Sequence, residues 1–165
     1  MAETLVKIHF ELDGDGWPGH GTETLWAMPI AENDQRVFQL RNSPFYTRGI
    51  NYLDVVRATP IENSYRMFDF AEVIERGGHS TYILLIRPDD ARRGAYCNML
   101  EALGCSYEGA QIALNGVEHL LYSVDVPPTT DVYEVYEILE RGEREGVWMF
   151  QEGYANVSEA LPKGH

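Results

Sequence analysis

The sequence predicts an α+β fold in which a small antiparallel β-barrel-like unit is followed by a ferredoxin-like βαββαβ unit. Three observations lead to this prediction. Apolar and polar residues alternate through most of residues 4–75, as they do in half-buried antiparallel strands. From Tyr82 to Ile86 the apolar residues are consecutive, which is typical of a central strand covered on both faces. Two segments with helical periodicity then follow that strand.

The first half contains segments with the pattern of short strands. Apolar residues alternate with polar ones from Val6 to Leu12, which buries one face of this strand and turns His9 toward solvent. Further strands are expected at residues 23–30, 36–41, 53–59 and 67–74, with turn-forming residues such as 32–34 and 60–64 between them. Antiparallel strands at this spacing predict a small barrel or a curled sheet.

The loop at residues 13–21 carries two motifs that are associated with ligands. A Gly-x-Gly-x-x-Gly motif begins at Gly14, but the dinucleotide fingerprint requires a helix after its last glycine, and strand-like residues follow here. The pair Asp13 and Asp15 also begins like a calcium loop, yet the position of the bidentate glutamate is Thr24. We therefore expect an ordinary hairpin loop.

The second half has the order strand, helix, strand, strand, helix, strand, which is the ferredoxin-like order. One helix is expected to start at residues 88–90 and to end at Gly104, and the other to start at Asp131 and to end at Gly146. The expected buried faces are Ala95, Tyr96, Met99, Leu100 and Leu103 in the first helix and Val132, Val135, Tyr136 and Leu139 in the second. The other face of the second helix should be solvated and carries Glu137, Glu140, Arg141, Glu143, Arg144 and Glu145. We expect the barrel-like unit at residues 4–76, the ferredoxin-like unit at residues 79–153 and a flexible tail at residues 154–165.

Residues 106–126 are predicted to form a hairpin around Asn115-Gly116. A strict two-residue turn would place Ile112 opposite His119. If the apolar residues of both strands share one face, they match only when one extra residue is inserted. We therefore predict a β-bulge at Gly116 or Val117, with His119 on the solvent side.

Composition limits the partners and the compartment. The formal net charge of -13 disfavours nucleic acid, whose binding depends on clustered Lys and Arg. Such charge could steer a basic protein partner toward the chain, or it could simply keep the protein soluble. No apolar stretch is long enough to cross a membrane, and we expect a cytoplasmic protein. Cys97 and Cys105 are expected to be free buried thiols.

Several short motifs resemble a known family when they are taken together. They are Val6-Lys7-Ile8-His9-Phe10 with Trp17-Pro18, Glu23-Thr24-Leu25-Trp26-Ala27, Asn42-Ser43-Pro44-Phe45, Arg48-Gly49, Asp54-Val55-Val56, Gly78-His79-Ser80-Thr81, Leu103-Gly104-Cys105 and Val124-Asp125-Val126-Pro127-Pro128. On these motifs the chain resembles a bacterial family described as domain of unknown function 4265, over most of residues 5–153. The resemblance implies no catalytic residues, and it implies a small cytoplasmic accessory or immunity-type protein.

The junction at residues 74–81 offers the best candidates for chemistry. His79 could serve as a base and Ser80 as a nucleophile, with Glu75 to orient the imidazole. Neighbouring residues on an extended strand point to opposite faces, so this pair forms only if the Gly77-Gly78 turn bends them together. In the alternative interpretation, His79 and Thr81 hydrogen-bond the two halves to one another.

The loop at residues 42–51 is too aromatic for a plain connection. Phe45 is expected to plug one end of the barrel, because aromatic side chains usually serve burial first. Alternatively, Tyr46 and Arg48 line the mouth of a pocket, where the guanidinium would bind a carboxylate.

Two hypotheses about function follow. The first is a non-enzymatic binding or accessory protein, of the immunity type, that binds a basic protein. The second is a small enzyme or small-molecule binder with a pocket between the halves. The candidate binding residues are Trp26, Tyr46, Arg48, Glu75, His79 and Thr81. No catalytic residue, metal site or cofactor is assigned, since the histidines and cysteines lack ligand spacing. An enzyme should bring the polar candidates together in a pocket, whereas a binding module should leave them dispersed or satisfied within the fold.

Overall fold

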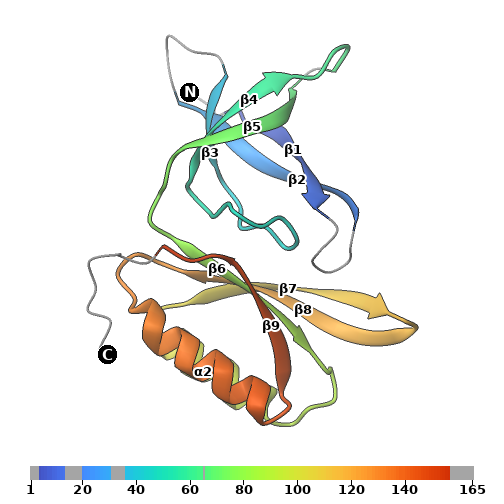
Figure 1. The fold of residues 1–165 in the computed structure, drawn as a ribbon, viewed down its shortest axis with the longest axis vertical. Coiled ribbons are helices and arrows are strands. Elements are labelled where there is room, and N and C mark those ends of the chain that lie inside the picture. Colours follow the sequence, from blue (N-terminus) through green and yellow to red (C-terminus); the bar gives the residue numbers. More distant parts are fainter. Residues whose placement is uncertain (1–3, 14–19, 31–35, 65, 157–165) are drawn as a thin grey trace.

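The computed structural model describes residues 4–13, 20–30, 36–64 and 66–156. These residues form a closed barrel of five strands and a separate sheet of four strands, accompanied by two helices. Figure 1 shows the barrel above and the sheet with its helices below, joined by the chain that enters the central part of the sheet. The predicted α+β class is therefore confirmed, as is the division into a barrel and a sheet with helices. Neither helix in the described ranges has the length and apolar character that crossing a membrane requires.

The barrel consists of β1 (Val6–Asp13), β2 (His20–Pro29), β3 (Val37–Leu40), β4 (Val55–Pro60) and β5 (Met67–Glu75). Consecutive strands pair antiparallel, and β1 pairs with β5 in parallel to close the barrel. The prediction of a purely antiparallel unit is wrong at this contact. An antiparallel meander alternates strand direction, so its first and fifth strands run the same way and can only meet in parallel.

The two ligand-like motifs of the first loop fall mainly outside the described residues, which stop at Asp13 and resume at His20. Strand β2 begins at His20 and pairs with β1, so the element that follows the glycines is a strand and not a helix. The hairpin is confirmed. The predicted turn at residues 32–34 also lies outside the described part of the chain.

The barrel interior is filled by apolar side chains from every strand. Its buried members are Val6, Ile8, Phe10, Leu25, Ala27, Phe38, Leu40, Ile50, Val56 and Ala58, with Phe68, Phe70 and Val73 packed against them. The aromatic loop contributes Ile50 to this core. Phe45, which we expected to plug the barrel, packs instead on the neighbouring sheet with Ile83 and Leu85.

The second unit comprises β6 (Ser80–Ile86), α1 (Arg93–Ala102), β7 (Ser106–Leu114), β8 (Val117–Val126), α2 (Val132–Arg144) and β9 (Trp148–Tyr154). The sheet order is β7-β8-β6-β9, and all neighbouring strands are antiparallel. Every residue of β6 is buried, as the consecutive apolar run predicted. Both helices pack on the face that carries Tyr82 and Leu84, and Phe45 and Tyr46 pack on the opposite face.

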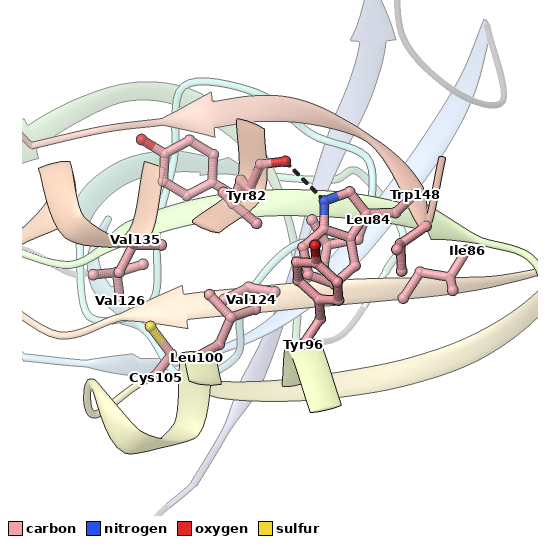
Figure 2. Close-up of a cluster of buried hydrophobic side chains, with 12 residues drawn as sticks. Tyr82, Leu84, Ile86, Tyr96, Leu100, Cys105, Val124, Val126, Val135 and Trp148 are labelled. Atoms are coloured by element: carbon pink, nitrogen blue, oxygen red, sulfur yellow. Dashed lines mark hydrogen bonds between the residues drawn. The ribbon is translucent and has the colours of Figure 1, made fainter. Parts of the chain in front are cut away.

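Figure 2 shows the core between the sheet and its helices, where Trp148 packs beside Tyr96. The Trp148 indole nitrogen donates a hydrogen bond of 2.9 Å to the carbonyl oxygen of Leu139 in α2. Two residues assigned to the buried helix faces are exposed, namely Ala95 in α1 and Tyr136 in α2. The charged outer face of α2 is exposed as predicted.

The predicted bulge in the β7–β8 hairpin is wrong. Ile112 lies opposite His119 in an unbroken register, and the turn residues Asn115 and Gly116 have φ values of 52° and 78°, as a two-residue type I′ turn requires. Our prediction assumed that only one face of the sheet was covered. Both faces are covered, so Ile112 packs toward the barrel side while Tyr122 packs toward the helices.

The helix ends follow the expected signals at three of four positions. Asp131 caps α2 by accepting from the Tyr133 amide, while Gly104 and Gly146 adopt positive φ just after α1 and α2. The start of α1 was predicted too early, since residues 88–89 and 91–92 form turns before the helix begins at Arg93. Strand β9 extends to residue 154, where the predicted tail starts, and residues 157–165 of that tail lie outside the described residues.

Candidate functional site

A buried carboxylate organises the junction where the chain leaves the barrel. Asp54 is fully buried and accepts hydrogen bonds of 2.9 Å from the amides of Asn51 and Gly77. It also pairs with the Arg76 guanidinium at 3.0 Å, and that guanidinium lies 3.6 Å from the ring centroid of Tyr154 in β9. A buried charge is costly unless it is paired in this way. The contacts therefore tie the end of the barrel to the edge of the sheet.

Further hydrogen bonds join the two halves directly. The buried Thr81 hydroxyl donates to the Asn51 side-chain oxygen at 2.5 Å, and the Ser123 hydroxyl donates to the Pro44 carbonyl at 2.6 Å. The Gly49 amide donates to the carbonyl of residue 153 at 2.9 Å. Thr81 thus makes the bond between the halves that the structural interpretation of the sequence predicted.

The His79 side chain lies between the two halves, where its ring contacts Asp125 and Tyr52 and not the Ser80 hydroxyl. Its Nδ1 lies 2.9 and 3.0 Å from the two carboxylate oxygens of Asp125, and its ring meets the Tyr52 ring edge to face at 5.2 Å. Burial raises the pKa of Asp125, and the nearby imidazole opposes that rise. The side chain of His79 is 12% exposed. It is therefore a junction residue, bound to the sheet by Asp125 and in contact with the first half through Tyr52.

The proposed His79, Ser80 and Glu75 cluster does not assemble. Glu75 is exposed at the end of β5, and the Ser80 hydroxyl accepts a hydrogen bond from the Asn156 amide at 2.8 Å. Asp125 occupies the orienting position that we assigned to Glu75. The register of the β6–β8 pairing explains this, because it places Asp125 of β8 opposite Thr81, two residues after His79.

The remaining candidates lie in separate environments. Trp26 is 43% exposed, and the Lys7 ammonium lies 5.0 Å from its ring centroid. Tyr46 packs against the sheet, and burial together with the charge of Glu23 raises the pKa of its hydroxyl. Arg48 is exposed. Of the six candidates, only His79 and Thr81 share the junction.

One carboxylate fixes the aromatic loop. Glu23 of β2 accepts hydrogen bonds from the amides of Phe45, Tyr46 and Thr47 at 2.7, 3.1 and 2.8 Å. It also accepts from the Thr47 hydroxyl at 2.8 Å. The loop therefore has a defined shape, and its position against the sheet follows from a strand residue.

A polar cleft of about 370 Å³ lies between the halves. Its walls are Arg41, Asn42, Ser43 and Tyr52 on the barrel side and Ser106, Tyr107, Glu108, Ser123 and Asp125 on the sheet side. None of the candidate residues lines this cleft. His79 is hydrogen-bonded to Asp125, which does line it. Several wall groups already serve the fold, because Asp125 binds His79, Ser123 binds the Pro44 carbonyl and the Tyr107 ring stacks on Tyr122.

Comparison with known proteins identifies the family of the chain and a solved structure with a similar fold. The family model described as "Domain of unknown function (DUF4265)" matches residues 23–150. The chain belongs to the DUF4265 family. Its fold is similar to that of a solved structure titled "Novel crystal structure of a hypothetical protein from Neisseria gonorrhoeae", with a TM-score of 0.70 and 18% identity over 96% of this chain and 100% of that chain. At that identity the likeness shows the fold alone. No curated protein matches the chain.

The residues that build the junction of this DUF4265 chain were largely missed by sequence reasoning. Asp54 and Asp125 each stand next to apolar residues, and such an isolated carboxylate is a signal of a buried, paired group. The signal does not identify the partners, since Asp54 pairs with Arg76 and Asp125 with His79 from distant positions. Within the described ranges, no cluster of three His, Cys, Asp or Glu side chains is arranged to hold a metal ion.

Proposed function

We propose that this DUF4265 chain is a non-enzymatic binding protein that recognises a basic protein partner. The observation that carries the proposal is that the polar candidate residues are either hydrogen-bonded within the fold or exposed at separate places. His79 and Thr81 are engaged in hydrogen bonds that hold the fold together, while Arg48 and Glu75 are exposed at separate places. This is the dispersed and satisfied arrangement expected of a binding module, and it favours binding over catalysis.

The charge of the chain supports a basic partner. The formal net charge is -13, and the outer face of α2 exposes Glu134, Glu137, Glu140 and Glu143. The Arg141 guanidinium lies 5.6 Å from the ring centroid of Tyr96, so it is turned toward α1. Complementary charge raises association rates and selects partners. A cytoplasmic immunity-type protein that neutralises a basic toxin would use such a surface.

The second unit in this proposal is a ferredoxin-like module. Strand β8 lies between β6 and β7, the two strands joined by α1, and β6 lies between β8 and β9, the two strands joined by α2. This is the split βαβ pattern, so the strand order supports the assignment. Both helices then cover one face, and the acidic surface of α2 is presented to solvent.

A charge-neutralised helix tests the proposal. A lysine-rich peptide should bind the wild-type chain, with affinity that falls as salt is added. Replacing Glu134, Glu137 and Glu140 by Gln should weaken binding about tenfold, because each surface charge contributes modestly. Fluorescence anisotropy of a labelled peptide measures both effects.

The matched control removes the same charge from the barrel. Glu11→Gln, Glu62→Gln and Asp69→Asn alter exposed residues far along the chain from α2. The control should retain wild-type affinity. Equal loss in both variants would mean that net charge alone attracts the peptide, and a wild-type chain that binds no basic peptide would refute the proposed function.

The polar cleft favours a second function, the binding of a small polar molecule between the halves. Its walls carry Arg41 on one side and Glu108 and Asp125 on the other, so charges of both signs face a zwitterionic molecule. A thermal-shift screen of amino acids and related metabolites tests it. Ser106→Trp, which fills the cleft from an exposed position, should abolish any shift. Shifts that persist in this variant would exclude the cleft as the binding site.

A further inference from the structure

An aromatic groove of about 360 Å³ lies between α2 and the end of β9. Its lining residues are Tyr82, Val132, Tyr133, Tyr136, Glu152 and Ala155. None of them belongs to the polar cleft or to the hydrogen bonds of the junction. The volume falls within the range of small ligand sites, about 300–1,000 Å³.

Two of the lining tyrosines pack at an angle to one another, and one of them also packs against Phe150 beside the aromatic groove. The Tyr82 and Tyr136 centroids are 6.5 Å apart with planes inclined by 53°, and the Tyr136 and Phe150 centroids are 5.7 Å apart with planes inclined by 82°. Tyr136 is 39% exposed, so part of its ring is accessible to a ligand. Aromatic ring faces carry negative potential and attract a cation within about 6 Å.

Tyr82 places a hydroxyl-bearing ring at the aromatic groove. The residue as a whole is only 2% exposed, yet it is one of the residues that line the groove. Figure 2 shows this hydroxyl pointing away from Trp148. Burial, and then the charge of Glu152, raise the pKa of Tyr82, so the hydroxyl stays protonated. The oxygen of a protonated tyrosine hydroxyl can still accept a hydrogen bond, so it can act as an acceptor for a ligand in the aromatic groove.

Three carboxylates lie near the aromatic groove and make the surface around it negatively charged. Glu152 lies directly opposite Tyr82 on the neighbouring strand, so both side chains share one face of the sheet. On α2, Glu137 follows Tyr133 by four residues and Glu140 follows Tyr136 by four, which places each carboxylate beside a tyrosine on the helix surface. All three carboxylates belong to exposed residues.

We propose that the aromatic groove binds the side-chain ammonium group of a lysine presented by the basic partner. This inference rests on the proposed function and names the site at which the chain would recognise its basic partner. The rings of Tyr82 and Tyr136 attract the cation, and Glu152 supplies the counter-charge. The ammonium group carries three N–H donors, one of which donates to the Tyr82 hydroxyl oxygen. The four-carbon stem of lysine packs along Val132 and Ala155.

An NMR titration of the full chain tests the assignment. The probe is a short glycine- and serine-flanked peptide with a single lysine, and the matched probe carries norleucine in place of the lysine. The lysine peptide should shift the tyrosine ring signals of the aromatic groove and bind about tenfold more tightly than the norleucine peptide, the size expected for a partly desolvated cation–π contact.

Variants separate the contributions of ring and hydroxyl. Tyr136→Leu should weaken lysine-peptide binding about tenfold, and Tyr136→Phe should stay within about twofold of wild type, because the ring is retained. Tyr82→Phe should weaken binding by about threefold, since it removes only one hydrogen bond. Met149→Ala serves as the control, because Met149 is exposed on β9 and does not line the aromatic groove.

Three results would overturn the assignment. They are equal binding of the norleucine peptide, unchanged binding to Tyr136→Leu, and peptide-induced shifts confined to residues outside the aromatic groove. The proposed function fails separately, when the wild-type chain does not bind the lysine-rich peptide at all. If that peptide binds and depends on the α2 carboxylates but not on Tyr136, only the aromatic groove is refuted.

Discussion

Glu23 illustrates how much of this fold depends on single polar side chains. Its carboxylate receives three loop amides and one hydroxyl from residues 45–47. Glu23→Gln replaces one acceptor oxygen by a donor, so some of these donors lose their partner. We expect the free energy of unfolding to fall by about 1–3 kcal/mol, measured by urea denaturation. Glu11→Gln on the adjacent strand makes the same charge change at an exposed position and should have little effect. Equal effects of the two variants would contradict the structural role of Glu23.

His79 permits a similar test at the junction. In His79→Ala the partly buried Asp125 carboxylate loses its partner, and we expect the melting temperature to fall by several degrees, corresponding to about 1–3 kcal/mol. A double-mutant cycle with Asp125→Ala should show coupling, because the two side chains are in contact. An unchanged melting temperature together with a lost thermal shift from a small molecule would instead support the ligand-binding function of the polar cleft.

The cysteines predict a pH dependence of stability. Both are free and buried, as the sequence suggested. Burial, with a smaller effect of the Asp125 charge, raises the pKa of Cys105 to about 12. Above the ordinary thiol pKa of about 8.5, the unfolded chain loses a proton that the folded chain retains, so the free energy of unfolding should decrease as pH rises through this range. Denaturation of wild type and Cys105→Ala at several alkaline pH values should show a weaker decline in the variant. Parallel declines would show that Cys105 does not contribute.

At the scale of elements, the contact between α2 and β9 depends on the absence of a side chain. A Cβ atom at Gly142 would lie 2.5 Å from Trp148 Cε2. Alanine favours a helix over glycine by about 1 kcal/mol, but here the overlap should outweigh that gain. We expect Gly142→Ala to lower the free energy of unfolding by about 1–3 kcal/mol. Gly94→Ala in α1 meets no atom within 4 Å and should be neutral or stabilising, so a calorimetric comparison of the two variants isolates the steric effect.

The helices and strands also show which sequence patterns were sufficient to predict the structure. Alternation and helical periodicity located the strands and helices, because each pattern is local. The β7–β8 register failed since it depends on what covers the second face of the sheet, and that cover is supplied by Phe45 and Tyr46 from far along the chain. The exposure of Tyr136 was likewise missed, because helical spacing alone cannot distinguish a core position from the wall of a groove.

At the scale of the whole molecule, the order of elements could be predicted but the contacts between the halves could not. Thr81 was named as a junction residue, yet its partner Asn51 is thirty residues away and its identity follows only from the assembled fold. The same holds for His79, whose partner is Asp125 and not Glu75. The candidate binding residues lie in separate environments for the same reason, since the sequence does not show which distant segments the fold brings together.

The strands of the barrel are contiguous in the chain, ending at Glu75, whereas the apolar strand β6 needs partners from β8 and β9, of which the latter ends at Tyr154. On the ribosome, the barrel can therefore close while the sheet is still incomplete. During that interval β6 is an unprotected apolar segment with free edges, which is the kind of segment that associates between chains. Slowing translation after Ile86 should consequently raise aggregation more than slowing it before Glu75.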